Sequence, residues 1–334
     1  MKIAIQQGNG FSKRWLVYCE RNRIPFKLVD CYRSDIIAQL QECDALMWHF
    51  SHNNYRDMLF AKQLIFSLEK AGKKVFPNSD TAWHFDDKVG QKYLLESVNA
   101  PMVPSYAFYD KTTAFNWIEE TSFPKVFKLR SGAGSENVKL VKTKKHARKL
   151  VRKAFGKGFP QFDRFQNLKE RLRKFREGKD SFLGLLKGFG RLFIPTELAR
   201  MRNKEKGYVY FQDFISGNDH DIRVIVIGDK AFAIKRMVRK NDFRASGSGH
   251  ILYEKEHFDP NLIQLAFQLN EKLKSQCIAY DFVFENGKPL IVEISYGFSQ
   301  KVYDPCTGFY DKKLDFHPGH FNPQEWMVDL LTKK

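Results

Sequence analysis

The alternation of hydrophobic and polar positions predicts a chain built from short strands and amphipathic helices. Over the first 80 residues, brief apolar runs with strand character alternate with stretches of helical period. The expected strands are residues 2–6, 26–30, 44–49 and 74–77, and the expected helices are residues 11–21 and 57–71. Strands that alternate with helices form parallel sheets covered by helices. This stretch therefore predicts a small open α/β domain that ends near Asp80.

The remainder of the chain predicts antiparallel strands and a few well-marked helices. Asp86 or Asp87 can cap a helix that ends before Pro101, and Asp259-Pro260 has the cap and first-turn proline of another helix. Strands at 123–129 and 138–141 flank a glycine-bearing loop at 131–135, and a basic helix follows at 144–155. Further strands are expected at 208–215, 221–227 and 230–238, and a hairpin is expected at 278–295.

Gly8 and Gly10 follow the first predicted strand and invite comparison with a dinucleotide-binding loop. The third glycine of that motif is absent. A tight turn is therefore the favoured interpretation.

Two carboxylates interrupt the apolar strands of the predicted hairpin, Asp281 in IAYDFVFE and Glu293 in KPLIVEIS. A buried carboxylate is costly without a balancing cation, so a magnesium ion with oxygen ligands is one interpretation. The other is a surface position that faces solvent or Lys and Arg. A two-residue turn at Asn286-Gly287 would place the carboxylates on opposite faces, whereas a three-residue turn at 286–288 would pair them directly, with Cβ atoms about 5 Å apart.

Several short motifs occur in a fixed order along residues 77–295. They are PNSD and DDK between 77 and 88, FKLRSGAGSENV at 127–138, QDFI at 212–215, DIRV at 221–224, KR at 235–236, NDFRAS at 241–246 and the final hairpin. Their order resembles that of the ATP-grasp carboxylate–amine ligases, particularly the ribosomal-protein glutamate ligases, and is similar to that of glutathione-synthetase-like proteins. The resemblance implies an α/β protein with the ATP-grasp fold. The implied domains are an N-terminal α/β domain at 1–85, a central and lid lobe at 86–207 with a basic helical insertion at 156–206, and a C-terminal lobe at 208–334.

The resemblance also implies which residues bind ATP and magnesium between two lobes. Those expected at the phosphates are Lys88, Lys128 and the loop residues Ser131, Gly132, Gly134 and Ser135. Those expected at adenine and ribose are Gln212, Asp213, Phe214, Ile215 and Asp221. The expected ligands of one or two magnesium ions are Asp281, Glu293 and Ser295. The family usually has Asn where this chain has Ser295, whose hydroxyl is a weaker magnesium ligand on a shorter side chain.

A carboxylate becomes a good electrophile when the γ-phosphoryl group of ATP turns one of its oxygens into a leaving group. The resemblance thus implies an ADP-forming ligase that joins a carboxylate to an amine through an acyl phosphate. Arg236 and Arg244 are candidates for holding the carboxylate and the developing oxyanion, with surface salt bridges as their alternative role. Two alternatives stay open. One is a kinase of the same fold, and the other is a nucleotide-binding module without turnover that recruits partners to the membrane.

The net charge of +18 is concentrated in one segment. Residues 142–206 hold 21 Lys and Arg against 6 Asp and Glu, eight Phe and the apolar run FLGLLKGFGRLFI at 182–194. This composition suits an anionic membrane surface or a long anionic substrate, and it equally suits a lid elaboration whose Phe residues form its own core. Nucleic acid is less favoured, since no recognised fold for it appears. Bacterial proteins with these motifs resemble proteins of surface glycan assembly. The resemblance implies a reaction that joins an amino acid to a sugar carboxylate at the inner membrane face.

The remaining features exclude several other classes of protein. The N-terminus lacks the layout of a signal peptide and no apolar run approaches about 20 residues, so we expect a soluble cytoplasmic protein. The five cysteines are scattered, so we expect reduced, mostly buried thiols rather than disulfides or a zinc site. His84, His317 and His320 have no metal-site spacing and are assigned to packing or substrate contact.

Overall fold

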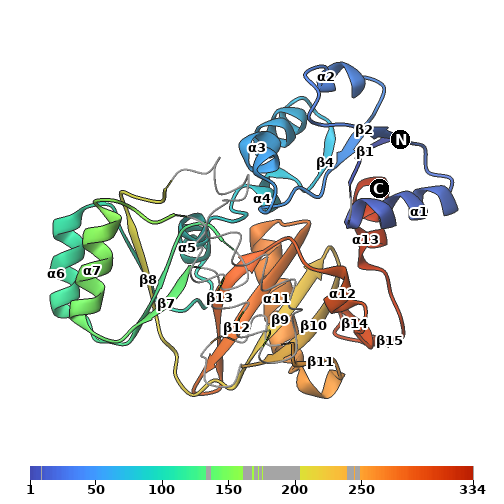
Figure 1. Cartoon of the computed structure of the whole chain (residues 1–334). Coiled ribbons are helices and arrows are strands. Elements are labelled where there is room, and N and C mark those ends of the chain that lie inside the picture. The colour runs from blue at the N-terminus through green and yellow to red at the C-terminus, as the bar shows by residue number, and fades with distance from the viewer. Residues whose placement is uncertain are drawn as a thin grey trace. The chain divides into compact units, whose positions relative to one another are not determined.

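The structure is a computed structural model of the chain, and it describes residues 1–8, 10–132, 137–160, 204–238, 244 and 249–333, together with Leu168, Leu172 and Phe175. The described chain divides into two compact units (Figure 1). The first comprises Met1–Ser51, Arg56–Val103 and Ile215–Lys334, and the second comprises His52–Tyr55 and Pro104–Phe214. Each unit has a hydrophobic core of its own.

The N-terminal part of the first unit is a parallel four-stranded sheet in the order β2-β1-β3-β4, as the alternation of strands and helices predicts. Its strands are β1 (Ile3–Gln6), β2 (Phe26–Val29), β3 (Ala45–Met47) and β4 (Lys74–Phe76). Its helices are α1 (Phe11–Arg21), α2 (Ile36–Gln39), α3 (Tyr55–Lys70) and α4 (Ser79–Ala82). Gly10 has a φ of 83° directly before α1, a conformation that favours glycine at this turn.

The C-terminal part of the first unit is a larger sheet in the order β13-β12-β9-β10-β14-β15, with β11 paired to β10. Its strands are β9 (His220–Ile227), β10 (Lys230–Met237), β11 (Ile251–Leu252), β12 (Cys277–Glu285), β13 (Lys288–Ser295), β14 (Gly308–Asp311) and β15 (Phe316–Pro318). The accompanying helices are α5 (Lys88–Ser97), the 3-10 helix η1 (Lys255–His257), α11 (Pro260–Leu273), α12 (Gln300–Tyr303) and α13 (Pro323–Thr332). The two predicted caps are confirmed, because Asp87 accepts a hydrogen bond from the Gly90 amide and Asp259 accepts one from the Asn261 amide.

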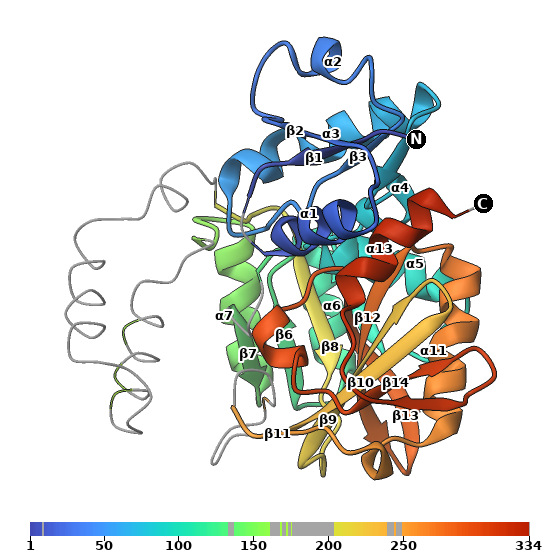
Figure 2. The same ribbon diagram turned by 90° about the vertical axis from the view of Figure 1, so that its right-hand side faces the viewer.

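The two faces of this sheet pack against different helices. Ile222, Val224 and Val226 of β9 point to the face that α11 covers. Ile225 and Ile227 point to the opposite face and pack with residues of α1 and α13, which lie side by side in Figure 2. The period of two along each strand therefore assigns Asp221 and Arg223 to the same face as Ile225.

The second unit is an antiparallel sheet in the order β5-β8-β6-β7, on which two helices pack. Its strands are β5 (Ser105–Phe108), β6 (Lys125–Lys128), β7 (Val138–Val141) and β8 (Val209–Asp213). Its helices are α6 (Lys111–Glu120) and α7 (Lys144–Ala154). The strands predicted on both sides of the glycine-bearing loop are confirmed, as is the basic helix.

The hairpin of β12 and β13 corrects one expectation and confirms another. The turn has two residues, since Glu285 pairs with Lys288, and Asn286 and Gly287 have φ values of 50° and 77°. The three-residue turn is therefore wrong. Asp281 and Glu293 are nevertheless directly paired, because the pairing steps from Phe282–Ile291 to Asp281–Glu293. The extra residue, Val292, forms a β-bulge that brings Glu293 to the face of Asp281.

All five cysteines are buried free thiols, as their scattered positions predict. None of the described helices combines the length and apolar character needed to cross a membrane. The apolar run at 182–194 and most of the predicted insertion lie outside the described residues.

Candidate functional site

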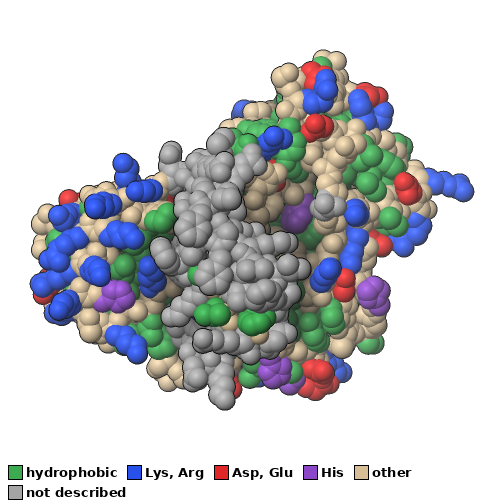
Figure 3. Space-filling view, viewed as in Figure 1, with side chains coloured by type: hydrophobic (Ala, Val, Ile, Leu, Met, Phe, Trp, Pro, Cys, Tyr) green, Lys and Arg blue, Asp and Glu red, His purple; other side chains and the backbone are tan. Residues whose placement is uncertain are grey.

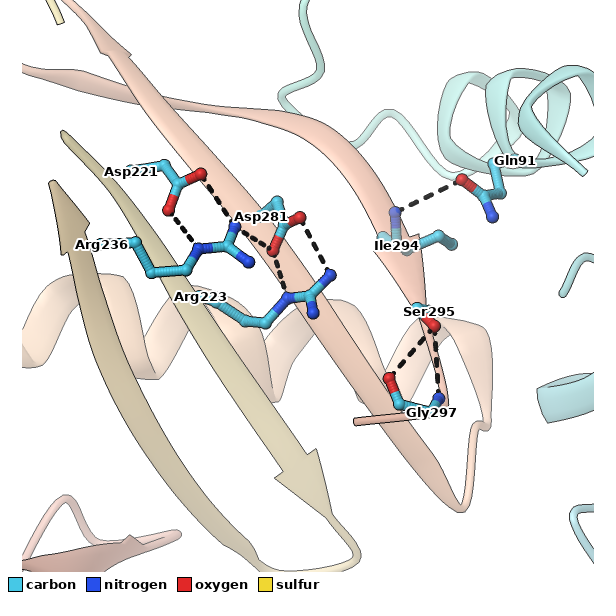
Figure 4. Close-up of polar contacts among 8 residues, drawn as sticks. All are labelled: Gln91, Asp221, Arg223, Arg236, Asp281, Ile294, Ser295 and Gly297. Carbon is cyan, nitrogen blue, oxygen red and sulfur yellow. Dashed lines mark hydrogen bonds and ion pairs between the residues drawn. The ribbon is translucent and has the colours of Figure 1, made fainter. Parts of the chain in front are cut away.

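One face of the larger sheet carries a buried group of four charged side chains (Figure 4). Asp221 and Arg223 come from β9, Arg236 comes from β10 and Asp281 comes from β12. In the strand register Arg223 lies opposite Asp281, and Arg236 lies opposite Asp221. Directly opposite residues share a face and meet at short range, so strand pairing itself positions these ion pairs.

Each arginine binds one carboxylate in a bidentate manner, from Nε and Nη2 to its two oxygens. Arg236 donates from Nε to Asp221 Oδ1 at 2.6 Å and from Nη2 to Asp221 Oδ2 at 2.8 Å. Arg223 donates from Nε to Asp281 Oδ1 and from Nη2 to Asp281 Oδ2, the latter at 2.9 Å. Arg236 Nη2 also lies 3.1 Å from Asp281 Oδ1. Asp281 thus joins the two arginines into one network.

Burial sets the electrostatics of this network. The four side chains are 8% to 17% exposed. Burial by itself would raise the pKa of Asp281, but the charges of Arg223 and Arg236 outweigh it and hold that pKa below its ordinary value. Burial raises the pKa of Asp221, against the opposing charge of Arg236. The Asp281 side chain is therefore a carboxylate whose charge depends on its arginine neighbours.

Arg223 and Tyr303 belong to the network although neither was predicted. The buried Tyr303 side chain of α12 is, after Asp281, a further electrostatic and hydrogen-bonding partner of Arg223. Arg223 could have been found from the sequence, because it lies two residues after Asp221 and so shares its strand face. Tyr303 has no such signal, since only the tertiary fold brings it to β9.

A second ion pair joins the first residue of α5 to β13. Lys88 Nζ lies 3.0 Å from Glu293 Oε1, with side chains that are 6% and 31% exposed. Glu293 is thus the more accessible of the two predicted carboxylate ligands. Ser295 Oγ accepts a hydrogen bond from the Gly297 amide at 3.2 Å and lies 3.4 Å from the Gly297 carbonyl oxygen (Figure 4).

Three carboxylates in this region face three cations: Asp221, Asp281 and Glu293 against Arg223, Arg236 and Lys88. Among the residues that the structure describes, no group of three or more His, Cys, Asp and Glu side chains is gathered to hold a metal ion. The alternative in which the hairpin carboxylates face Lys and Arg holds for both residues, although only Glu293 is near the surface. Asp281 is buried against arginines, and Glu293 is partly exposed against a buried lysine.

In the second unit the structure brings together three other predicted residues. Lys128 Nζ donates to Gln212 Oε1 at 2.6 Å, and Gln212 Nε2 donates to Ser105 Oγ at 3.0 Å. Lys125 pairs with Asp213 at 2.5 Å. Lys128 and Gln212 are both buried, so an ammonium group and an amide are held at the adjacent strands β6 and β8.

The other predicted site residues make separate contacts or lie outside the residues that the structure describes. Ser131 Oγ donates to Glu205 Oε1 at 2.9 Å, and Gly132 has a φ of 114°. Phe214 and Ile215 follow β8 and are half-buried. Gly134 and Ser135 lie outside the described residues, as do both flanks of the half-buried Arg244.

Two of the three histidines have defined surroundings. His84 is 1% exposed, next to α4. His317 Nε2 lies 2.9 Å from Asp311 Oδ2, and its ring stacks on Phe309 with centroids 4.9 Å apart. These positions agree with packing roles for both residues.

Known proteins with the same architecture cover almost the whole chain. A RimK domain ATP-grasp protein of Sphaerobacter thermophilus is 14% identical, with a TM-score of 0.55 and 99% of each chain covered. D-alanine–D-alanine ligase of Bacillus anthracis, in complex with ATP, is 14% identical, with a TM-score of 0.56 over 90% of this chain and 88% of that one. The biotin carboxylase domain of the Hydrogenobacter thermophilus 2-oxoglutarate carboxylase, in complex with MgADP, is 12% identical, with a TM-score of 0.60 over 100% of this chain and 70% of that one.

Identities this low show the fold alone, and that fold is the ATP-grasp fold, as the motif order predicts. Residues 196–304, which include Asp221, Arg223, Arg236, Asp281 and Glu293, match the profile of the RimK-like ATP-grasp domain. This match covers about a third of the chain, so residues 196–304 are similar to the RimK-like ATP-grasp domain. A comparison with curated protein sequences finds no match.

Proposed function

We propose that this protein is an ADP-forming carboxylate–amine ligase that uses ATP and magnesium to make an amide bond through an acyl phosphate. The observation that carries the proposal is the paired carboxylates Asp281 and Glu293, on one face of a hairpin within the RimK-like segment. ATP and MgADP are bound by two proteins of the same fold, D-alanine–D-alanine ligase and the 2-oxoglutarate carboxylase domain.

The donor chemistry fits magnesium that arrives with a nucleotide better than it fits a free ion. A carboxylate offers about four lone-pair positions, and three N–H donors already occupy Asp281. Glu293 is the accessible donor, and magnesium prefers one or two carboxylates together with phosphate oxygens. When bound, magnesium would neutralise charge on the phosphates. The ammonium groups of Lys88 and Lys128 are proposed to hold those phosphates. Asp221 is proposed to contact the ribose, and residues 212–215 are proposed to contact adenine.

Charge balance gives this fit a measurable consequence. Adding Mg²⁺ to three carboxylates already balanced by three cations is unfavourable, whereas the magnesium–ATP complex brings a net negative charge. We expect magnesium with ATP to raise the thermal unfolding temperature, and magnesium alone at the same concentration to leave it unchanged. Equal stabilisation by magnesium alone would point to a dedicated metal site.

Arg236 and Arg244 are proposed to hold the carboxylate substrate and the oxyanion. Arg236 is fixed by Asp221 and Asp281, so its guanidinium is oriented before any substrate binds. Preorganised charge of this kind stabilises a developing negative charge without reorganisation. Ser295 is proposed as a weaker ligand of a second magnesium ion.

Product analysis separates the proposed ligase from its alternatives. A ligase should release ADP and phosphate only when a carboxylate and an amine are both present, and should form a hydroxamate when hydroxylamine replaces the amine. A kinase would instead yield a stable phosphorylated product, and a module without turnover would bind ATP and release nothing.

The Glu293→Gln variant is expected to lower turnover at least about 100-fold, because loss of a metal ligand removes several kcal/mol of charge stabilisation. Its fold should persist, since Glu293 is 31% exposed. The matched control is Glu285→Gln at the exposed tip of the same hairpin, which should keep full activity. Asp281→Asn is a poorer test, because it leaves two buried arginines without their shared carboxylate. Near-normal activity of Glu293→Gln would rule out the metal assignment.

For the substrates, we propose an amino acid as the amine and a carboxylate of a surface glycan or its precursor as the acceptor. The reaction would take place in the cytoplasm at the inner membrane face. This proposal is supported only by the resemblance of the motif order to proteins of glycan assembly. A screen of amino acids with uronic-acid glycans for ADP release tests it, and the proposed ligase activity survives if another carboxylate–amine pair is turned over.

A further inference from the structure

Helix α7 carries its cations on one continuous face. Six of its 11 residues are Lys or Arg, at 144, 145, 148, 149, 152 and 153. All six are exposed, whereas Ala147, Leu150, Val151 and Ala154 are buried in the core of the second unit. The helix is therefore fixed by its apolar side and presents its charged side to solvent.

This arrangement is unfavourable for the helix itself. Like charges four residues apart destabilise a helix, and α7 has four such pairs: 144 with 148, 145 with 149, 148 with 152 and 149 with 153. Glu119 of α6 pairs with Arg148 at 2.6 Å and lies 3.9 Å from Lys144. Within the described ranges, no carboxylate forms an ion pair with Lys145, Lys149, Arg152 or Lys153. Residues 137–160 contain nine Lys and Arg and no Asp or Glu, so the residues on both sides of α7 add to its positive charge.

We propose that the exposed face of α7, with the adjoining Lys142 and Lys157, docks on an anionic lipid surface by charge attraction without insertion. Figure 3 shows Lys and Arg side chains gathered over the α6–α7 lobe. The 11 residues of α7 span roughly 16 Å, enough to face several lipid headgroups at once. The apolar side of α7 is occupied by its own core, so the helix contributes no insertion and the contact must be sensitive to salt.

The residue types on this face favour headgroups over nucleic acid. Seven of the nine cations in 137–160 are lysines, which act as point charges, whereas bidentate recognition of individual phosphates uses arginine. Apart from His146, α7 exposes only Lys and Arg, and it has no exposed aromatic side chain on which a base could stack. The inference rests on α7 and its described neighbours alone, and it is independent of the proposed ligase activity.

The test is sedimentation of the full chain with vesicles of phosphatidylcholine, with and without 30% phosphatidylglycerol. The wild type should sediment with the anionic vesicles at about 50 mM salt, dissociate at about 500 mM salt, and ignore the neutral vesicles. The triple variant Lys142→Gln/Lys145→Gln/Lys149→Gln should bind the anionic vesicles roughly 100-fold more weakly, which corresponds to about 1 kcal/mol for each removed cation. Its folding should be unaffected, because the substitutions remove repulsion on an exposed face.

A matched variant separates a docking surface from the overall charge. Lys13→Gln/Lys70→Gln/Lys301→Gln removes the same charge from exposed positions outside the proposed surface and should bind within about 3-fold of wild type, because these positions are not part of the α7 face. Equal losses in both variants, or no sedimentation of the wild type at low salt, would overturn the proposal. So would release from the vesicles by an RNA duplex at a phosphate concentration well below that of the anionic lipid, which would identify nucleic acid as the partner.

Discussion

Replacing Arg223 by methionine is expected to lower the free energy of unfolding by about 3–5 kcal/mol, because it leaves a buried charge without its main partner. Arg223 holds both oxygens of Asp281, and the Asp281 side chain is only 12% exposed. Methionine keeps the apolar stem of arginine and removes its charged group, so most of the loss reports the missing charge. Urea denaturation at pH 7 provides the measurement.

The double variant Arg223→Met/Asp281→Asn is the control for this interpretation. It removes both charges of the pair and keeps Arg236 bound to Asp221. We expect it to recover most of the stability lost in Arg223→Met, since breaking a buried pair costs more than removing both partners. A double variant that loses the sum of the two single effects would show that Arg223 acts through packing alone.

Acidification from pH 6.5 to pH 4 is expected to cost wild type about 3 kcal/mol of stability through His84 alone. Burial lowers the pKa of His84 from its ordinary 6.5 to about 4. Above pH 6.5 this imidazole is neutral in both the folded and unfolded chains and contributes no pH dependence. Between the two pKa values the unfolded chain binds a proton that the folded chain excludes, so the free energy of unfolding falls as the pH falls.

The variant His84→Leu isolates this contribution. Neither ring nitrogen of His84 has a partner in good hydrogen-bond geometry among the described residues, and the charge of Asp87 and weak backbone contacts with Asp80 and His84 itself only partly oppose the effect of burial. Urea unfolding is measured at pH 7, 5.5 and 4.5. As the pH falls, the free energy of unfolding of the wild type should decrease relative to that of the variant. Parallel pH profiles would mean that His84 is protonated in the folded state and that its burial does not govern its pKa.

Local patterns in the sequence predicted much of the fold, and where they failed the reason differs between elements. The parallel N-terminal sheet and α11 were predicted because strand alternation, a cap and a proline all act within a few residues. The helix α13 was missed although Asn322-Pro323 has the same signature as Asp259-Pro260, and Asn322 does accept a hydrogen bond from the Gln324 amide. The signal for α13 was present in the sequence.

The bulge at Val292 was beyond sequence reasoning. Ile291, Glu293 and Ser295 read as one unbroken alternation, and nothing in that pattern marks Val292 as the extra residue. Only the burial of Ile294 in the core beneath α11 shows where the strand changes phase.

The candidate site was predicted in part for a similar reason. The sequence identified Asp281 and Glu293 on one hairpin, but their direct pairing depends on the bulge at Val292, which the sequence does not mark. The cations that balance them come from β9, β10 and α5, at Arg223, Arg236 and Lys88, and only the assembled sheet brings them into range. Sequence patterns therefore identified the carboxylates and left their neutralisation undetermined.

The bulge in β13 makes the hairpin tip a favourable place for protein engineering. Ile291 and Ile294 are fully buried on either side of the extra residue, so the register at Glu293 is anchored independently of the turn. The four residues of the tip, Glu285, Asn286, Gly287 and Lys288, are all exposed. A fluorophore or a short epitope inserted at Asn286-Gly287 would therefore report from the same hairpin as the carboxylates without displacing them.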